Sequence, residues 1–406
     1  MAATILRIPI TNVYGGGDYT APITVGGQGA VANVILDTGS STLAVVPRAY
    51  DASADKSAQF TALAQDVIYG TGGWTGPVIT TSLSMGTGGQ SVSVDTNLAI
   101  TDVQESGNFG TADGILGLAF NSLNQAYNLS AYLTQRGVSP ALTYPWPFPV
   151  RNSSAGVQRF SQFLNRMPQE DLPPYFTALE TQGVTRNLFA LYTLRSTPSM
   201  RTADPASDPL NGGFFILGGG PEQTDLYSGD FIRADVVDDL YYNTNLLAVQ
   251  VSGGQQITAQ PLPAQYAASM VSNSIVDSGT NGLVLAPDVY QAIVSSLGQV
   301  NPAFGNLISQ AAQQSIPSGS LDLAQWPDIS FTLQGETGDP VSLTCSPQTY
   351  WQTDAPAAGQ AIFQISNSQM PQSILGLPLM NNYYTVFDRT QDPYGVVCFA
   401  AITPLA

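Results

Sequence analysis

Short apolar runs, separated by Gly, Pro, Asn and Ser, recur along the whole chain. Runs of this length between turn residues are typical of β-strands. A few segments instead repeat apolar residues at helical spacing, which favours amphipathic helices. The pattern therefore predicts a mainly β protein with few short helices. The predicted strands include 19–25, 91–100, 214–217, 246–251, 329–333 and 383–387, and the predicted helices are 175–182, 287–297 and 304–314.

The two halves of the chain repeat one pair of motifs. In the first half an apolar strand ends in Asp37-Thr-Gly-Ser, and Ile115-Leu-Gly follows much later. In the second half another apolar strand ends in Asp277-Ser-Gly-Thr, and Ile374-Leu-Gly follows later. A small hydroxylated residue and a glycine allow a tight turn directly after each Asp. Two such halves facing each other would bring two carboxylates together.

Composition excludes several kinds of chemistry. The chain has 406 residues, enough for two sizeable cores. It contains 29 acidic and 12 basic residues, and its net charge of −17 disfavours nucleic-acid and anionic-membrane partners. Without histidine there is no Ser–His or Cys–His catalysis and no His-ligated metal, so we expect no metal and no cofactor. No apolar run reaches the length of a membrane span, and no signal peptide is visible at the start.

The chain has two cysteines, Cys345 and Cys398, each in an apolar strand-like run near the C-terminus. Two cysteines cannot form a Cys₄ metal cluster. They either form one disulfide in an oxidising compartment or stay as two buried thiols. We predict the disulfide, which would link two parts of one lobe.

Further motifs complete a resemblance to a known family. The segments that carry it are Asp37-Thr-Gly-Ser-Ser, Asp277-Ser-Gly-Thr, Tyr69-Gly-Thr-Gly, Ala112-Asp-Gly-Ile-Leu-Gly-Leu-Ala-Phe120, Phe215-Ile-Leu-Gly-Gly-Gly220, Ser373-Ile-Leu-Gly and Tyr384-Thr-Val-Phe-Asp388. Over nearly its whole length the chain resembles the pepsin family of aspartic proteases. Two further segments, Ser41-Thr-Leu-Ala-Val and Tyr69-Gly-Thr-Gly-Gly-Trp74, are similar to the beta-secretase branch.

The resemblance implies two β-barrel-type lobes related by pseudo-twofold symmetry. The N-terminal lobe would span 1–195 and carry the first Asp loop, the flap and an insertion near 121–172. The C-terminal lobe would span 196–406 and carry the second Asp loop.

The resemblance also implies the active-site residues. Asp37 and Asp277 match the catalytic pair, which would activate a water for attack on a peptide bond and give an acid pH optimum. The other matches are the supporting hydroxyls Thr38, Ser40, Ser278 and Thr280 and the substrate-binding positions Gly39, Tyr69, Gly70, Thr71, Ile115 and Gly279.

Two positions depart from the family pattern. Ala44 stands where pepsin has the tryptophan that bonds the flap tyrosine, so Tyr69 would be looser or bonded elsewhere. Leu377 stands where pepsin usually has Asp, which would remove one local polar contact.

The family resemblance predicts a monomeric endopeptidase with protein or peptide substrates and sensitivity to pepstatin-type inhibitors. It would act in a secreted or acidic vacuolar or lysosomal-type compartment, with an intracellular site as the alternative. The rival functions are a catalytically silent binding or inhibitor protein of the same family and a structural all-β adhesion or carbohydrate-binding protein. Asn128 and Asn152 lie in glycosylation sequons that a secreted protein could use.

Overall fold

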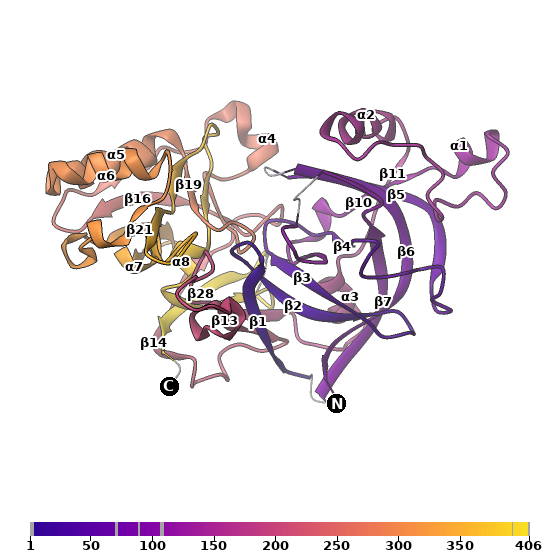
Figure 1. Ribbon diagram of the computed structural model, residues 1–406, viewed down its shortest axis with the longest axis horizontal. Helices are drawn as coiled ribbons and strands as arrows, with labels where there is room; N and C mark the ends of the chain where they lie inside the picture. The colour runs from indigo at the N-terminus through magenta and orange to yellow at the C-terminus, as the bar shows by residue number, and fades with distance from the viewer. Residues whose placement is uncertain (1–3, 70–71, 88–89, 106–108, 392, 405–406) are drawn as a thin grey trace. The chain divides into compact units, whose positions relative to one another are not determined.

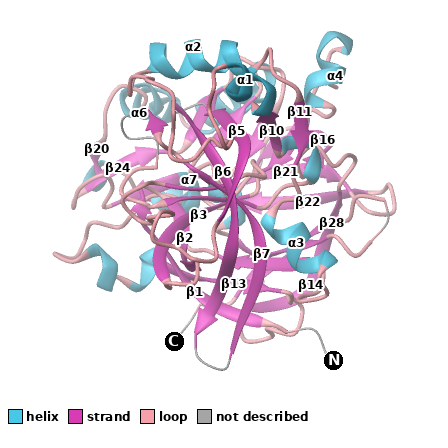
Figure 2. Cartoon of the chain, turned by 90° about the vertical axis from the view of Figure 1, so that its right-hand side faces the viewer, coloured by secondary structure: helices cyan, strands magenta, loops and turns pink. Residues whose placement is uncertain are grey.

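The computed structural model describes residues 4–69, 72–87, 90–105, 109–391 and 393–404. Backbone contacts group the chain into two compact units. The first contains Thr20–Thr185, and the second contains Ile5–Tyr19 with Arg186–Ala406. Strands are the commonest regular structure in both units and the helices are short (Figure 2), which confirms the predicted mainly β class. The predicted boundary between 195 and 196 stays a prediction.

One long sheet forms most of the first unit. Its strand order is β11 (Gln169–Asp171), β10 (Gln125–Asn128), β5 (Gln59–Tyr69), β6 (Gly72–Thr87), β7 (Gln90–Ile100), β4 (Leu43–Val45), β9 (Gly114–Gly117), β3 (Ala30–Asp37) and β2 (Asp18–Val25). The short strand β8 (Val103–Gln104) pairs with β6. Because β6 also pairs with β2, the sheet curls back on itself, as in a barrel.

The second unit contains several sheets. One follows the order β1 (Leu6–Gly15), β13 (Gly212–Leu217), β12 (Leu188–Tyr192), β27 (Tyr383–Asp388), β28 (Val396–Ile402) and β14 (Tyr227–Asp235). Another follows β15 (Asn243–Thr244), β18 (Ser274–Val276), β26 (Ser373–Leu375), β19 (Leu283–Leu285) and β25 (Ile365–Asn367). Two smaller ones are β17 (Ile257–Thr258), β16 (Leu246–Val251), β21 (Ile329–Gln334) and β22 (Pro340–Cys345), and β20 (Ile316–Pro317), β24 (Gln360–Phe363) and β23 (Trp351–Thr353).

The predicted helices are confirmed, with small shifts at their ends. They are α3 (Tyr175–Thr181), α5 (Pro287–Val300) and α6 (Pro302–Ala311). Helices α5 and α6 contact each other, and α5 also packs on β16 (Figure 1). The stripe of Val289, Ile293 and Leu297 on α5 is buried. The helix continues through Gly298, where the sequence suggested an end. The remaining helices are α1 (Ser130–Gln135), α2 (Ser154–Leu164), α4 (Ala267–Met270), α7 (Pro347–Tyr350) and α8 (Leu377–Met380).

Helix α2 lies within the segment predicted as an insertion, and the sequence analysis did not predict it. Its composition is polar and its first turn contains Gly156, which disfavours a helix. Its stability comes from the face with Val157, Phe160 and Leu164, which is buried against the rest of the unit. Around Phe160 the insertion builds an aromatic cluster of its own, with Trp146 and Phe148 at 5.3 and 5.0 Å between ring centroids.

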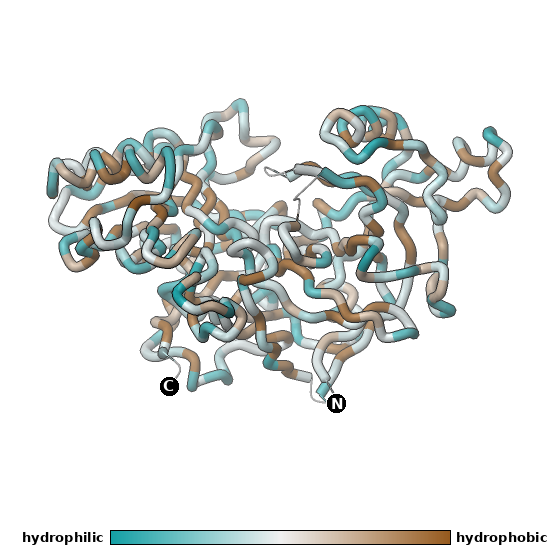
Figure 3. The backbone as a smooth tube through the Cα atoms, in the orientation of Figure 1, coloured by the Kyte–Doolittle hydropathy of each residue, from teal (hydrophilic) through white to brown (hydrophobic). Residues whose placement is uncertain are grey.

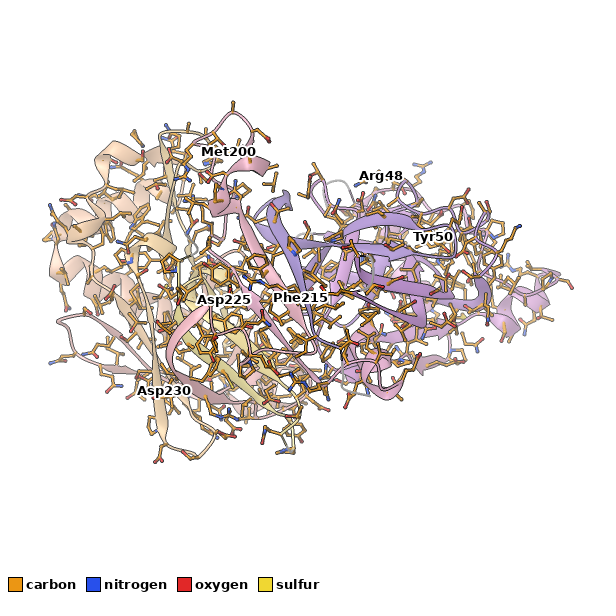
Figure 4. The ribbon with its side chains drawn as sticks, turned by 90° about the horizontal axis from the view of Figure 1, so that it is seen from below. Arg48, Tyr50, Met200, Phe215, Asp225 and Asp230 are labelled. Atoms are coloured by element: carbon orange, nitrogen blue, oxygen red, sulfur yellow. The ribbon has the colours of Figure 1, made fainter. Side chains whose placement is uncertain are left out.

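Apolar side chains fill the interior of each unit. Hydrophobic stretches recur along the strands, whereas the outer loops contain more hydrophilic residues (Figure 3). In the second unit Phe189 stacks on Phe387 at 4.8 Å, and Phe215 lies beside it on β13 (Figure 4). Full burial of one such side chain contributes roughly 1.5–3 kcal/mol. Within the described residues, no helix combines the length and apolar character that a membrane crossing requires.

A buried carboxylate, Asp55, organises one end of the first unit. Its Oδ2 accepts hydrogen bonds from the hydroxyls of Tyr50 (Figure 4) at 2.6 Å and Thr81 at 2.7 Å. Its Oδ1 accepts from the backbone N–H of Gly27 and from both the N–H and the hydroxyl of Ser57. Burial alone would raise the pKa of Asp55, but these hydrogen bonds outweigh it and hold the pKa well below its ordinary value.

The predicted disulfide is wrong, because Cys345 and Cys398 are both free and buried. Cys345 ends β22, and its Sγ lies 3.3 Å from the Thr349 hydroxyl. Cys398 lies on β28, in a different sheet, and packs among side chains that include Tyr384 and Val386. The sequence showed two apolar strands but not that they belong to different sheets. The alternative of two buried thiols is the arrangement found.

We expect both thiols to be inert in the native protein. Burial raises the pKa of Cys345 and of Cys398 to about 12, so almost no thiolate is present at neutral pH. Iodoacetamide should modify neither cysteine in the folded protein, and both in guanidinium chloride without any reductant. Mass spectrometry counts the adducts. Two unmodified cysteines under denaturing, non-reducing conditions would indicate a disulfide and contradict the structure.

We expect Asp55→Ala to destabilise the protein by roughly 2–3 kcal/mol, because it leaves several buried donors without an acceptor. The pKa of Asp55 is lowered in the folded state, so its contribution is complete above the unfolded value of about 3.9 and decreases as the pH falls below it. Urea denaturation should therefore show a constant difference from wild type down to about pH 5 and a smaller one below about pH 4. The control is Asp51→Ala, an exposed carboxylate in the same loop. An equal effect of both variants would contradict this assignment.

Candidate active site

In the first unit, Asp37 is the last residue of β3, and the loop that follows returns as β4. Strand β9 lies between these two strands. It runs parallel to β3, with Gly117 opposite Asp37, and antiparallel to β4, with Ile115 opposite Ala44. The Ile-Leu-Gly segment therefore separates the strand that enters the Asp loop from the strand that leaves it.

The second unit repeats this arrangement. Asp277 directly follows β18, and the chain returns as β19. Strand β26 runs parallel to β18 and antiparallel to β19, with Ile374 opposite Ile275 and Val284. The duplication predicted from the two motifs is thus present in the strand pairing of each unit.

The glycine of each Ile-Leu-Gly segment fits against the backbone of its Asp loop. A Cβ on Gly117 would lie 2.5 Å from backbone atoms of Ser41, and one on Gly376 would lie 2.3 Å from the carbonyl oxygen of Thr280. The residue after each glycine then donates its backbone N–H to the loop, Leu118 to Asp37 at 2.7 Å and Leu377 to Thr280 at 2.9 Å. Only a residue without a side chain allows this approach.

Both carboxylates are held by the same two kinds of donor. Asp37 Oδ1 accepts from the N–H of Gly39 at 2.8 Å, and its Oδ2 accepts from the hydroxyl of Ser40. Asp277 Oδ1 accepts from the N–H of Gly279 at 2.8 Å, and its Oδ2 accepts from the hydroxyl of Thr280 at 2.6 Å. The two Asp residues are 6% and 7% exposed, so each loop orients a nearly buried carboxylate.

The other predicted positions lie close to these loops within their own units. Thr38 and Ser278 are buried directly after the two Asp residues, and their predicted role in locking the loops stays a prediction. Ile115 is buried on β9 in an apolar cluster with Ala44 and Trp74. Gly70 and Thr71, the predicted flap tip, lie outside the described residues.

Tyr69 has an indole partner in spite of Ala44. The Nε1–H of Trp74, five residues further along the same hairpin, donates to the Tyr69 hydroxyl at 3.4 Å. The Trp74 ring is buried in the cluster that contains Ala44, where a small residue on β4 leaves room for it. Of the two predicted outcomes for Tyr69, bonding elsewhere is the one found. Burial raises the pKa of the Tyr69 hydroxyl, and the charge of Asp37 raises it further, so the hydroxyl stays protonated.

At Leu377 the side chain is apolar and fully buried, and its backbone N–H still bonds the Asp277 loop. Leu118 occupies the same place in the first unit. Ser41 was not predicted as part of the site, although its hydroxyl donates to the carbonyl of Phe120 and ties the Asp37 loop to the segment after β9. The serine pair Ser40-Ser41 was visible in the sequence, but its two different partners were not.

Comparisons with known proteins agree with this geometry. A family model described as "Eukaryotic aspartyl protease" matches residues 18–143 and 160–399. Pepsin A of Sus scrofa is 26% identical over 97% of this chain and 84% of its own length. Pepsin-2B of Gadus morhua is 25% identical over 93% of this chain and 95% of its own. Beta-secretase of Strongylocentrotus purpuratus is 24% identical over 56% of this chain and 44% of its own.

We expect Gly117→Ala to destabilise the protein by roughly 3 kcal/mol or more, because the new methyl group has no space beside Ser41. The matched control is Gly298→Ala in the last turn of α5, where a Cβ meets no atom within 4 Å. That variant should be stabilised by about 0.5–1 kcal/mol through its higher helix propensity. Urea denaturation followed by tryptophan fluorescence compares the two. A Gly117→Ala protein as stable as wild type would show that the loop tolerates a side chain there.

Proposed function

The chain belongs to the eukaryotic aspartyl protease family, and on that premise we propose that it is an aspartic endopeptidase with Asp37 and Asp277 as its catalytic pair. The observation that carries the proposal is the repeated loop. Each unit holds one nearly buried carboxylate with a backbone N–H on one oxygen and a hydroxyl on the other. A protein that used only one of the two carboxylates would not need this arrangement twice.

The proposed chemistry follows from placing two carboxyl groups at one water. Two acids in close proximity do not both ionise, a property for which aspartic proteases are themselves the standard example. The ionised member takes a proton from the water, whose oxygen attacks the amide carbon. The protonated member donates its proton to the carbonyl oxygen. When the tetrahedral intermediate collapses, the Asp that took the proton of the water gives it to the leaving nitrogen, the other Asp takes back the hydroxyl proton, and the C–N bond breaks. No covalent enzyme intermediate forms.

The neighbouring residues support this reaction in the proposal. Ser40 and Thr280 orient the carboxylates, and Thr38 and Ser278 hold the loops in place. The absence of side chains at Gly39 and Gly279 lets the substrate backbone approach. The positions proposed to contact the substrate are Tyr69, Gly70, Thr71 and Ile115.

We further propose a monomer that cleaves extended polypeptides and binds pepstatin-type inhibitors. An acidic setting, either secreted or in a vacuolar or lysosomal-type compartment, suits this chain for two reasons. One member of the pair has to be protonated, and the net charge of −17 produces repulsion that acidification relieves.

The test is peptide cleavage by wild type, Asp37→Asn and Asp277→Asn. The amide has nearly the shape of the acid but cannot pass a proton, so we expect kcat/KM to fall roughly 10²–10⁴-fold in either variant. The matched control is Asp230→Asn, an exposed carboxylate on β14 (Figure 4), which should keep full activity. Wild type should show an acid optimum, inhibition by pepstatin and no inhibition by chelators.

Activity retained in either loop variant would refute the catalytic pair. A wild-type chain that binds pepstatin yet cleaves no peptide in a diverse mixture would instead identify the silent binding protein. Circular dichroism of each variant separates loss of chemistry from loss of fold.

A further inference from the structure

We propose that the first unit carries an exosite, a pocket on α2 lined by Arg151 and Arg159 that binds a carboxylate-rich segment of a polypeptide. That this polypeptide is a substrate rests on the proposed function. The binding itself does not, because the pocket is built within one unit and contains neither of the proposed catalytic residues.

The charge pattern around this pocket is the reverse of that of the whole chain. The chain carries a net charge of −17 and has only 12 basic residues. Between Gly114 and Gln169 there is no Asp or Glu, and four of the basic residues lie there. They are Arg136, Arg151, Arg159 and Arg166. The stretch of chain that builds the pocket therefore carries only positive charges, although the carboxylate of Glu105 from a neighbouring segment also contacts α2.

These arginines differ from others in how they are paired. Arg7, Arg48, Arg186, Arg201 and Arg233 each form an ion pair with an Asp or Glu. The four in the insertion are exposed, and none forms an ion pair within the described part of the chain. Arg136 lies over the Tyr132 ring, and Arg159 uses its Nε to donate to the Ala155 carbonyl at 3.2 Å.

Arg151 and Arg159 line one open pocket of about 430 Å³. Pro149, Val150 and Phe160 contribute apolar walls to it. A guanidinium group matches a carboxylate through two parallel N–H···O bonds, and two such groups in one pocket favour an anion with more than one carboxylate. The apolar walls suit a polypeptide segment better than a small inorganic ion.

The pocket is preorganised by its surroundings. Gly156, in the first turn of α2, lies so close to the Arg151 carbonyl that a Cβ there would be 2.1 Å from the oxygen. The backbone of Arg151 is thereby held against the helix that carries Arg159. Phe160 is held from behind by Trp146 and Phe163, at 5.3 and 5.2 Å. Fixed walls reduce the entropy lost when a ligand binds.

The N-terminal groups of α2 are not the groups that would bind the ligand, because they already have hydrogen-bond partners. The Ser153 side chain already accepts from the Gly156 N–H, and Ser154 donates to the carboxylate of Glu105 at 2.6 Å. The ligand-binding groups we assign are the two guanidinium groups.

Two further observations favour a polypeptide that the same unit would process. Val157, between the pocket residues Gly156 and Phe160, contacts the hairpin that carries Tyr69, since a Cβ on Gly73 would lie 3.3 Å from its methyl group. Helix α2 therefore packs on that hairpin (Figure 1). The segment 144–159 also lies outside the family match, so the pocket belongs to this chain and not to the family pattern. A long polyanion or an anionic membrane would meet the repulsion of the remaining negative surface.

The binding test uses a fluorescein-labelled Glu-Gly repeat peptide, which has no bulky apolar residue, and the corresponding Gln-Gly peptide. Fluorescence anisotropy with wild type at about pH 6, where Glu is ionised, should show saturable binding of the Glu peptide only, and weaker binding in higher salt. The double variant R151Q/R159Q should bind at least about tenfold more weakly. The matched control R136Q/R166Q removes the same charge outside the pocket and should change the affinity less than about threefold.

Equal losses in the two double variants would show diffuse attraction and overturn the pocket, as would equal binding of the Gln peptide. Displacement of the peptide by inorganic phosphate, or tighter binding of an oligonucleotide, would overturn the assignment to a carboxylate-rich polypeptide. Thermal unfolding of both variants should match wild type, because all four side chains are exposed.

A kinetic measurement tests the link to substrate. Appending the Glu-Gly sequence to a cleaved peptide should lower KM about tenfold relative to a Gln-Gly tail, with kcat unchanged, and R151Q/R159Q should abolish the difference. Binding without this effect would leave an anion pocket unconnected to turnover and overturn the exosite. Absence of any cleavage would count against the proposed function while leaving the binding result intact.

Discussion

The structure of each Asp loop depends on one close contact between two backbones. A strand from a distant part of the sequence lies between the strands that enter and leave the loop, and a glycine has to stand at its C-terminal end, as the last residue of β9 and directly after β26. At Gly117 the opposing atoms are the backbone of Ser41, and at Gly376 they include the carbonyl of Thr280. Because main-chain atoms form these contacts on both sides, no change of side-chain rotamer could relieve the steric clash of a larger residue. The carboxylates are consequently oriented by main-chain geometry, and the hydroxyls of Ser40 and Thr280 complete that orientation.

The described part of the chain contains few ion pairs, each between an arginine and an Asp or Glu. The arginine side chains in the ion pairs of the described residues are 32–56% exposed, and pairs exposed on both sides contribute little. Arg201 differs from the others, because its partner Asp208 is a buried carboxylate. Besides the buried carboxylates Asp55 and Asp208, several buried polar positions are satisfied by hydroxyl and amide groups. Asn273, for example, bonds both the N–H and the C=O of Leu246 through its side chain. Amide and hydroxyl hydrogen bonds do not titrate in acid, whereas a carboxylate in an ion pair loses its charge. A framework built in this way keeps its bonds at a pH where salt bridges weaken.

The sequence predicted those features that depend on local pattern. It was less informative about features that depend on contacts between residues far apart in the chain. The strands were predictable because apolar runs and turn residues alternate, and the two Asp loops because each motif contains its own turn. The predicted disulfide between Cys345 and Cys398 was wrong, because the sequence of two apolar strands does not show which sheet each strand joins. Helix α2 was not predicted, because Gly156 disfavours a helix and the polar residues of α2 interrupt its short apolar pattern. The aromatic residues that cover this face precede it in a proline-rich stretch, and such a stretch is typical of a loop.

The hairpin of Tyr69 shows how such distant contacts become mutually dependent. From one direction the indole of Trp74 packs into the cluster with Ala44, and the small side chain at position 44 is what leaves room for it. Gly73, beside Trp74, meets Val157 of α2, where a Cβ would lie 3.3 Å from the valine methyl and 3.0 Å from the Val67 carbonyl. A larger residue at position 73 would push α2 away, and a larger one at position 44 would displace the indole. Neither residue can be understood alone. The small side chain of Ala44 leaves room for the indole of Trp74, and the absence of a side chain at Gly73 leaves room for Val157 of the insertion. The departure from the family pattern at Ala44 is therefore compensated within one hairpin, and Gly73 is one of the places where the insertion packs closely on that hairpin.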